Sequence, residues 1–421
     1  MLKIPYIPVE QRWLLADDKI VQLLNSENPN LDVNKFVLKA RYILAILICF
    51  IAFSRVVYFY VKQFFITKSH NYDIVTSIVL SLSRGYDTNN IYKLFEINDS
   101  ENVTISAYSL ADYMMYVQPN LITLIKLFYN SSHCFFLILR AQLPSQVRLL
   151  LLKNSISKIS IYTYLRAFFL AFKEKYPNIT VYTDGAMLPA HASVSFNITT
   201  VRTFHGLIQK IHPYTFPEYD SIYVYSEKEK RYLINTGIKS KVYVYPFDQL
   251  RFLDKAVVFF MADSVSVVQP DDFNSIVVMF HSLGYKIYIK SHPLNSAPKK
   301  LVDEYKISPH NWWDVLDMTY VEHIKGLDAE TTIKEKKPSF VVGWESTALC
   351  EALNMGVLPI NFLDLSDGAP KAVYPVSDMS LKWPDDRRII EGLITRKYNY
   401  DDVVKSLRNV GRSVFISSKT L

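Results

Sequence analysis

The sequence predicts an α/β protein with two doubly wound, parallel-sheet domains that face a central cleft, preceded by an apolar helical region. Short β-rich runs alternate with helical runs from about residue 75 onward, which is typical of parallel sheets covered by helices. The alternation restarts after residues 246–255, which indicates two blocks rather than one. The chain has 421 residues and is 50% hydrophobic. It is therefore long enough for two or three domains of roughly 150 residues. The expected domains are Rossmann-like.

The first block contains four predicted strands and one clear helix. The helix covers residues 227–236, and Gly237 is expected at its carboxyl end. The strands are rich in Val, Ile, Tyr and Thr, the residues that favour extended structure. They cover residues 102–108, 179–183, 221–225 and 241–245.

The second block repeats the pattern with four more strands. They cover residues 256–261, 286–290, 339–342 and 357–362, and helices are expected at 271–283 and from Ser346 to Asn354. The predicted organisation is an apolar, helical N-terminal region (1–74), an acceptor domain (75–250) and a nucleotide-donor domain (251–421).

An apolar run near the beginning of the chain raises the question of a membrane. Residues 42–53 are unbroken and apolar, Ser54 and Arg55 interrupt the run, and residues 56–61 continue it. A spanning helix needs about 20 apolar residues, and a central Arg costs ~3 kcal/mol on insertion. Basic residues flank the run at Lys39, Arg41, Lys62 and Lys68. The run is therefore a marginal membrane span.

Two further stretches, 121–140 and 146–172, mix apolar and aromatic residues with spaced Lys and Arg. Such stretches are typical of helices at a membrane surface. Three alternatives follow for the apolar segments: attachment to a membrane surface, which we favour, a single span at 42–61, or plain core helices.

Composition and missing motifs exclude several classes. Three cysteines, none in a metal-type pair, exclude a disulfide scaffold and a zinc ribbon. The sequence has neither a G-x-x-x-x-G-K-[ST] nor a G-x-G-x-x-G motif, so P-loop and dinucleotide sites lack support. The net charge of +7 suits anionic partners, but the basic residues are dispersed, which argues against nucleic acid.

The first candidate site is Thr183-Asp184-Gly185, directly after a predicted strand. Parallel sheets bind ligands at the carboxyl ends of their strands. A carboxylate at this place can therefore act as a general base toward an acceptor hydroxyl. The plain alternative is that Asp-Gly forms a turn.

The second candidate is Ser291-His292-Pro293, directly after the predicted strand that ends at Lys290. Pro293 restricts His292 to extended backbone, so its ring can project from the strand end and offset charge on a departing phosphate. The alternative is a loop histidine. His212-Pro213 has no preceding strand and ranks lower.

The third candidate is the start of the predicted helix at Ser346. Ser346, Thr347 and free backbone N–H groups at a helix start form an anion site, and Glu351 one turn later can accept hydrogen bonds from ribose hydroxyls. An ordinary Ser346 N-cap is the alternative, and both can hold together. No metal site is predicted.

A fourth candidate is Phe204-His205-Gly206, with Gln209 and Lys210 behind it. His205 can serve as a base or orient a substrate, and Gly206 permits close approach of the backbone. The alternative is again a loop histidine.

In this order, these residues resemble bacterial glycosyltransferases of the GT-B architecture, above all the CMP-sialic acid-dependent sialyltransferases and polysialyltransferases of surface polysaccharides. The matches are Asp184-Gly185, His292-Pro293 and Ser346-Thr347. The resemblance implies that Asp184 is the base, that His292 assists departure of CMP, and that Ser346 and Thr347 bind phosphate or the sugar carboxylate. That family has two acids before the Gly, whereas Thr183 stands at the first position here.

The sequence is also similar to CDP-glycerol glycerophosphotransferases. His205-Gly206 with Lys210, and Lys290 through Pro293, fit the motifs of that family, and this resemblance makes His205 the base. Both resemblances cover roughly residues 180–365. Both imply a cytidine-activated donor, an inverting displacement that needs no cofactor or metal, and work at a membrane surface.

The sequence thus predicts a glycosyltransferase that moves a sugar, taken to be sialic acid, from a CMP donor to a hydroxyl of a capsule or lipopolysaccharide glycan or a lipid-linked acceptor. The alternatives are a glycerophosphotransferase and a non-catalytic, membrane-associated capsule-assembly protein. Because activated sugars are cytoplasmic in bacteria, the predicted location is the cytoplasmic face of the inner membrane, with peripheral attachment.

Overall fold

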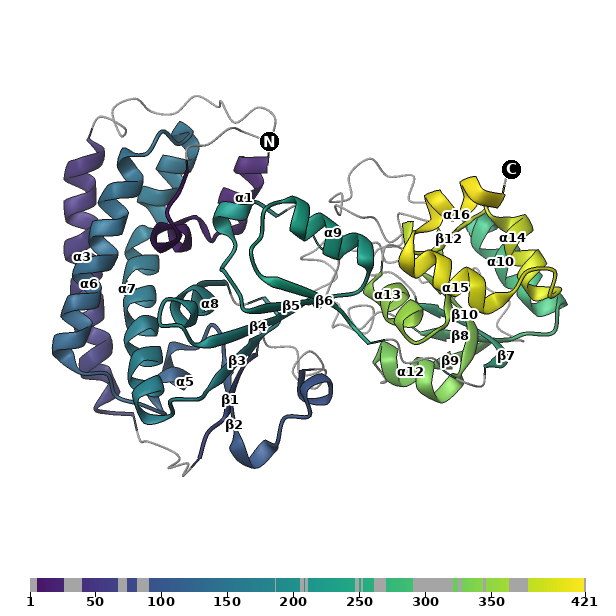
Figure 1. The fold of residues 1–421 in the computed structure, drawn as a ribbon, viewed down its shortest axis with the longest axis horizontal. Coiled ribbons are helices and arrows are strands. Elements are labelled where there is room, and N and C mark those ends of the chain that lie inside the picture. Colours follow the sequence, from purple (N-terminus) through teal and green to yellow (C-terminus); the bar gives the residue numbers. More distant parts are fainter. Residues whose placement is uncertain are drawn as a thin grey trace. The chain divides into compact units, whose positions relative to one another are not determined.

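The computed structural model confirms the predicted fold class: the chain is α/β, with two six-stranded sheets and apolar helices in its N-terminal region (Figure 1). The structure describes residues 6–25, 40–66, 74–81, 91–185, 187–204, 208, 211–246, 250, 253–260, 270–290, 321–324, 328–343, 346–362 and 378–419. The described chain divides into two compact units. The first holds residues 1–205, 210–223 and 233–243, and the second holds residues 206–209, 224–232 and 244–421.

The sheet of the first unit has the strand order β2-β1-β3-β4-β5-β6. The pairings from β2 through β5 are all parallel. The strands are β1 (Ser77–Ser81), β2 (Asn102–Ser106), β3 (Thr180–Thr183), β4 (Thr199–Thr203), β5 (Ser221–Val224) and β6 (Lys241–Val244).

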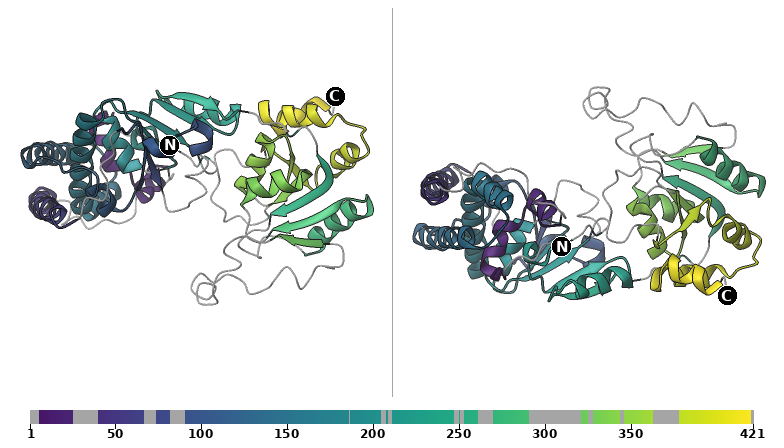
Figure 2. Two further views of the ribbon diagram at one scale, coloured as in Figure 1. Left: turned by 90° about the horizontal axis from the view of Figure 1, so that it is seen from below. Right: turned by 90° about the horizontal axis from the view of Figure 1, so that it is seen from above.

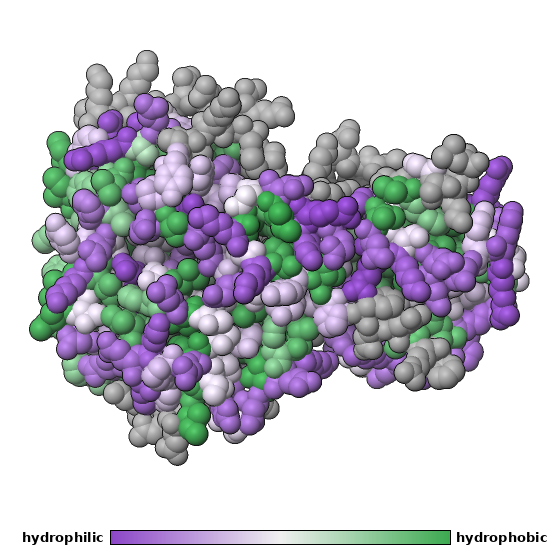
Figure 3. Space-filling model, viewed as in Figure 1, coloured by the Kyte–Doolittle hydropathy of each residue, from purple (hydrophilic) through white to green (hydrophobic). Residues whose placement is uncertain are grey.

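Most helices of the first unit lie on one side of this sheet. The long ones are α3 (Arg41–Gln63), α6 (Leu121–Arg140) and α7 (Ser145–Lys175). The short ones are η1 (Val9–Leu15), α1 (Asp18–Asn25), η2 (Asp99–Glu101), α5 (Leu110–Met114), α8 (Met187–Val194) and η3 (Pro213–Thr215). Helix α9 (Glu227–Asn235) is divided between the units, with residues 227–232 in the second and residues 233–235 in the first. In Figures 1 and 2, α3 and α6 form the outermost layer, and α7 lies between them and the sheet. In Figure 3, apolar surface is visible along the edge where α3 lies.

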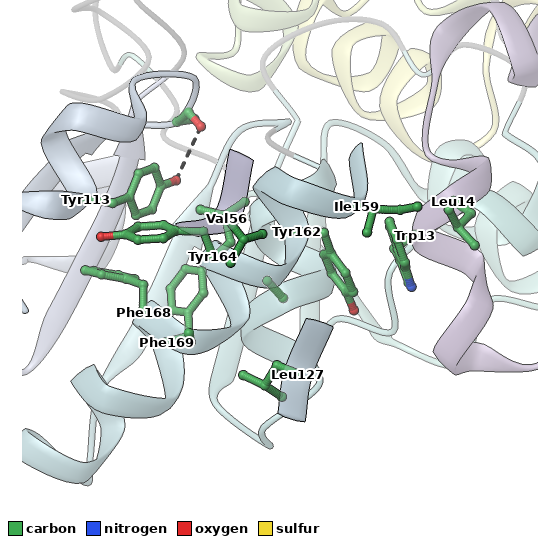
Figure 4. Close-up of a cluster of buried hydrophobic side chains, with 14 of the residues drawn as sticks. Trp13, Leu14, Val56, Tyr113, Leu127, Ile159, Tyr162, Tyr164, Phe168 and Phe169 are labelled. Atoms are coloured by element: carbon green, nitrogen blue, oxygen red, sulfur yellow. Dashed lines mark hydrogen bonds between the residues drawn. The ribbon is translucent and has the colours of Figure 1, made fainter. Parts of the chain in front are cut away.

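Helix α7 is the centre of the core of the first unit. Its buried aromatic residues pack against Tyr113 of α5 and Trp13 of η1, and Trp13 stacks on Tyr162 with ring centroids 4.0 Å apart (Figure 4). Tyr113 donates a hydrogen bond to the carbonyl of Ala107 at 3.3 Å, so its hydroxyl is satisfied inside the core. Of the alternatives for the stretch 146–172, α7 is thus mainly a core helix.

The sheet of the second unit has the order β12-β11-β10-β7-β8-β9, and all its pairings are parallel. The strands are β7 (Asp254–Phe260), β8 (Lys286–Lys290), β9 (Val321–Ile324), β10 (Pro338–Gly343), β11 (Leu358–Phe362) and β12 (Leu381–Trp383). The helices are α10 (Pro270–Ser282), α12 (Ala329–Lys336), α13 (Thr347–Asn354), α14 (Arg387–Ile394), α15 (Tyr400–Asn409) and α16 (Arg412–Lys419).

Four strands of the structure have no counterpart in the sequence prediction: β1, β4, β9 and β12. Strands β9 and β12 are the edges of their sheet, where short strands with polar residues are common. Strand β1 is buried along almost its whole length, and a short apolar run of this kind does not distinguish a strand from a buried helix by periodicity.

Candidate functional site

The sheet of the first unit has a topological switch point at β1. This strand pairs with β2 on one side and β3 on the other. The chain therefore runs from β1 to β2 on one side, and then passes from β2 to β3 on the opposite side of β1. Open α/β sheets bind ligands outside the carboxyl ends of the strands at such a point. Strand β3 ends at Thr183, and Asp184 follows directly. The topology therefore places the first predicted residue at the switch point.

Asp184 is held in a tight bend and is only 7% exposed. The hydroxyl of Thr183 accepts a hydrogen bond from the backbone N–H of Gly185 at 3.2 Å, so the turn that was the plain alternative for this motif is present. A turn and a functional carboxylate do not exclude each other, because the turn is what brings the side chain of Asp184 to the sheet edge.

Asp184 has two neighbours that the sequence did not indicate. Arg202, in register with Thr183 on the adjacent strand, donates a hydrogen bond from its guanidinium to the hydroxyl of Tyr219 at 3.3 Å. Burial raises the pKa of Tyr219; Arg202 opposes this shift, and the negative charge of Asp184 adds to it. The carboxylate, the phenol and the guanidinium therefore lie within electrostatic reach of one another.

Two aromatic rings hold the guanidinium of Arg202. Its central carbon lies 4.4 Å from the ring centroid of Phe204 and 4.7 Å from that of Phe216. The two rings are nearly parallel, and such cation–π contacts fix a cation in place. Arg202 is thus a positive group with restricted motion at the edge that carries Asp184. Strand β4, which positions it, has the sequence TTVRT; its threonines and valine favour extended structure, but this strand was not among those predicted from the sequence.

The alternative base, His205, lies outside the described residues, as do Gly206 and Lys210. Strand β4 ends two residues before His205 in the sequence. The assignment of His205 as the base stays a prediction.

The sheet of the second unit also has a switch point, between β7 and β10. Counted from β7, its order is 3-2-1-4-5-6, the order of nucleotide-binding sheets. Strand β10 leads to α13 through residues 344–346, and Ser346 is the N-cap: its hydroxyl accepts a hydrogen bond from the N–H of Ala348 at 3.3 Å. The predicted cap is confirmed. A helix N-terminus can bind an anion, and this one follows a strand at the switch point, where open α/β sheets bind ligands. The two features together suit an anion site.

Close packing joins β7, β10 and α13 at this edge. A Cβ atom on Gly343, the last residue of β10, would lie 3.4 Å from the carbonyl oxygen of Phe260 and 3.5 Å from the side chain of Leu349. At these distances a Cβ atom would make ordinary van der Waals contacts, so Gly343 lies close to both β7 and α13, but this packing does not exclude a methyl group.

Lys290 ends β8 at the same edge and is buried, with 8% of its surface exposed. Burial lowers the pKa of the Lys290 ammonium, and Asp328 partly offsets this. Asp328 is itself engaged as the N-cap of α12, where it accepts two hydrogen bonds from Thr331. A buried cation at a sheet edge, beside a helix N-terminus, suits a phosphate group. His292 and Pro293, which follow Lys290, lie outside the described residues.

Glu351 lies on α13, one turn after its start, close to Tyr225. Burial and then the charge of Glu351 raise the pKa of Tyr225 well above its usual value. The structure thus brings Lys290, Ser346, Thr347 and Glu351 to one edge of one sheet. Of Thr347, only the backbone is described.

The part of the chain that the structure describes contains no cluster of three or more His, Cys, Asp or Glu residues able to hold a metal. A hollow of the first unit, bordered by Arg12, Glu218 and Lys239, lies beside the amino ends of β5 and β6, since Glu218 precedes β5 and Lys239 precedes β6. Phe216, which packs on Arg202, also borders this hollow.

A buried acid in the second unit predicts a pH effect on stability. Glu229 is 1% exposed and accepts hydrogen bonds from the N–H groups of Tyr225 and Ser226, and burial raises its pKa from 4.5 to about 7. At pH values between 4.5 and about 7, the carboxyl group of Glu229 is protonated in the folded chain and ionised in the unfolded chain. We therefore expect this group's contribution to the free energy of unfolding to be complete below pH 4.5 and to fall by at most ~3 kcal/mol as the pH rises through about 7.

Urea unfolding at several pH values, compared with Glu229→Gln, measures this contribution, because the amide keeps the acceptor oxygen but does not titrate. From pH 5 to pH 8, the free energy of unfolding of the wild type should fall relative to that of Glu229→Gln. Glu227→Gln, on the same helix but with a side chain 43% exposed, is the control and should follow the wild type. A constant difference between the wild type and Glu229→Gln across the range would contradict the prediction.

No family model matches the chain, and no curated protein matches it. Among solved structures it is similar to UDP-GlcNAc 2-epimerase from Neisseria meningitidis bound to UDP-GlcNAc, at 12% identity over 82% of this chain and 98% of that one, with a TM-score of 0.42. It is similar to a S. aureus MnaA–UDP co-structure at 14% identity over 80% and 93%, with a TM-score of 0.41. A ugt transferase from Siraitia grosvenorii in complex with UDP gives 9% identity over 80% and 94%, and a TM-score of 0.41.

Proposed function

We propose that this chain is a glycosyltransferase that uses a nucleotide-activated sugar. The observation that carries the proposal is topological: Asp184 follows a strand at the switch point of one parallel sheet, and Ser346 follows a strand at the switch point of the other. Switch points are where such sheets bind ligands.

The donor would be bound by the second unit. Lys290 and the start of α13, with Ser346 and Thr347, would hold the phosphate, and Glu351 would accept hydrogen bonds from ribose hydroxyls. Two features support this role: the burial of Lys290 and the N-cap geometry of Ser346.

In the proposed reaction Asp184 removes the proton of an acceptor hydroxyl as that oxygen attacks the anomeric carbon. The new C–O bond forms on the face opposite the leaving group, the bond from the anomeric carbon to the phosphate oxygen breaks, and the nucleotide leaves. His292 would offset the charge that develops on the departing phosphate. The configuration at the anomeric carbon is inverted.

The finer assignment, a CMP donor with sialic acid as the sugar and a surface glycan as acceptor, rests on the motif resemblance. The CDP-glycerol alternative differs from it in the base, His205 instead of Asp184. A non-catalytic assembly protein would keep the fold and bind no nucleotide.

A thermal-shift panel of the full chain with CMP, CDP, UDP and GDP donors tests this proposal. A ligand at 100 times its dissociation constant stabilises the folded state by about 2.7 kcal/mol, which raises the melting temperature by several degrees. We expect the shift with cytidine donors. A shift with UDP donors alone would overturn the donor assignment, and no shift with any donor would overturn the enzyme proposal.

A further inference from the structure

The outer surface of α3 and α6 differs from the rest of the first unit. We propose that it is a docking surface for an anionic phospholipid bilayer and that α3 lies in the plane of the membrane. This inference goes beyond the proposed function and does not depend on it.

The exposed face of α3 is almost entirely apolar. From residue 42 to residue 61, Ser54 is the one exposed residue that is neither aliphatic nor aromatic. The large exposed side chains of α3 in this range are Tyr42, Ile43, Ile46, Leu47, Phe50, Ile51, Val57, Tyr58 and Val61. On α6 they are Leu121, Ile122, Ile125 and Tyr129. A continuous apolar surface of this kind marks an interaction site.

The two residues that interrupt this apolar run, Ser54 and Arg55, both have hydrogen-bond partners within the protein. The hydroxyl of Ser54 donates to the carbonyl of Phe50, one turn earlier, at 3.2 Å. Arg55, the charge that interrupts the apolar run, donates to the hydroxyl of Ser157 on α7 at 3.3 Å. The side chain of Arg55 therefore points toward α7, and the face itself presents no charge between Arg41 and Lys62.

Charge identifies lipid, rather than a second copy of this chain, as the partner. Neither α3 nor α6 contains an Asp or Glu. Apart from Arg55, which turns toward α7, their Lys and Arg residues are Arg41 and Lys62 on α3 and Lys126 and Arg140 on α6. Two copies meeting through this surface would bring like charges together, whereas anionic headgroups would neutralise them.

The packing of α3 favours a position along the membrane over a span. Its inner face, with Ala45, Ile48, Ala52 and Val56, is buried; Phe53 packs on Phe128 of α6 with ring centroids 5.1 Å apart. Both α3 and α6 are long and apolar enough to cross a membrane by length and composition.

On its other side, however, α7 carries polar contacts. Lys158 forms an ion pair with Asp17 at 3.3 Å, and Asn154 donates to the same carboxylate at 3.1 Å. A spanning α3 would bring this polar layer of α7 toward the hydrocarbon core, at a high cost. An α3 that lies in the interface buries only its apolar face.

Co-sedimentation of the full chain with phosphatidylcholine vesicles, with and without phosphatidylglycerol, tests the proposal. We expect binding to the vesicles that contain phosphatidylglycerol. The double variant Ile46→Glu/Phe50→Glu should weaken it by ~10-fold or more, since it removes two apolar anchors. Val278→Glu is the matched control, because Val278 is 53% exposed on α10 of the other unit, and it should bind like the wild type. Binding that is absent, or that survives the double variant, would overturn the proposal.

Two further measurements separate the alternatives. Sedimentation equilibrium that shows a dimer broken by the double variant would assign the surface to a second copy. Extraction of the wild-type chain from cell membranes by alkaline carbonate is expected, whereas release by detergent alone would overturn the in-plane position. The thermal shift with the donor nucleotide should be the same in the wild type and in the double variant. A failure of the membrane proposal is therefore distinguishable from a failure of the proposed function.

Discussion

Asp184→Asn is expected to reduce sugar transfer by roughly 10²–10⁴-fold, the range over which general bases contribute, and to leave the fold intact. Asn has nearly the same shape as Asp and keeps an acceptor oxygen, but it cannot take a proton at neutral pH. Because the carboxylate of Asp184 lies within electrostatic reach of both the Tyr219 phenol and the Arg202 guanidinium, the removal of its charge should change the melting temperature only slightly. Transfer from the donor to the acceptor, measured with thermal unfolding, checks both parts.

Asp220→Asn is the matched control for this variant. Asp220 belongs to the same sheet, but it precedes β5 and accepts a hydrogen bond from the N–H of Thr200 at 2.7 Å, so it lies at the opposite edge. Its substitution should change stability slightly and leave turnover unchanged. If His205→Ala abolishes transfer while Asp184→Asn retains it, the base is His205 and the glycerophosphotransferase alternative gains the support that the sialyltransferase assignment loses.

Lys290→Met is expected to weaken donor binding by roughly 10- to 100-fold, the equivalent of one hydrogen bond to a charged group. The same change should not destabilise the chain, because Lys290 is buried with a lowered pKa and Met removes the cost of burying a charge. Lower affinity for the donor, together with unchanged or higher stability, would indicate that Lys290 serves donor binding and not folding. Titration of the donor nucleotide by calorimetry and urea unfolding of the same preparations measure the two quantities.

Lys286→Met is the matched control, since Lys286 begins the same strand and is exposed. It should leave the affinity unchanged. Equal loss in both variants would show that net charge, and not the position of Lys290, controls the affinity. A loss of stability in Lys290→Met alone would indicate a structural role for this lysine.

Strong local patterns made much of the fold predictable. The strands at 180–183, 221–224 and 286–290 alternate or cluster β-branched and aromatic residues, and this local preference agrees with their place in the sheets. The end of α9 was equally predictable, because a glycine is expected just after a helix end. Gly237 indeed adopts a φ of +84°, which few other residues tolerate. The short edge strands β9 and β12 were not predictable in this way, since their pairing is decided by neighbours far away in the sequence.

The site follows the same division. Local sequence patterns indicated that Lys290 ends a strand and that Asp184 and Ser346 follow strands, because strand ends and N-caps are set by a few adjacent residues. The folded structure was needed to show that Asp184 and Ser346 lie beside switch points, that Arg202 and Tyr219 lie near Asp184, and that Arg55 turns toward α7. Strand order, burial and the direction of a side chain depend on contacts between segments far apart in the chain, which no local pattern contains.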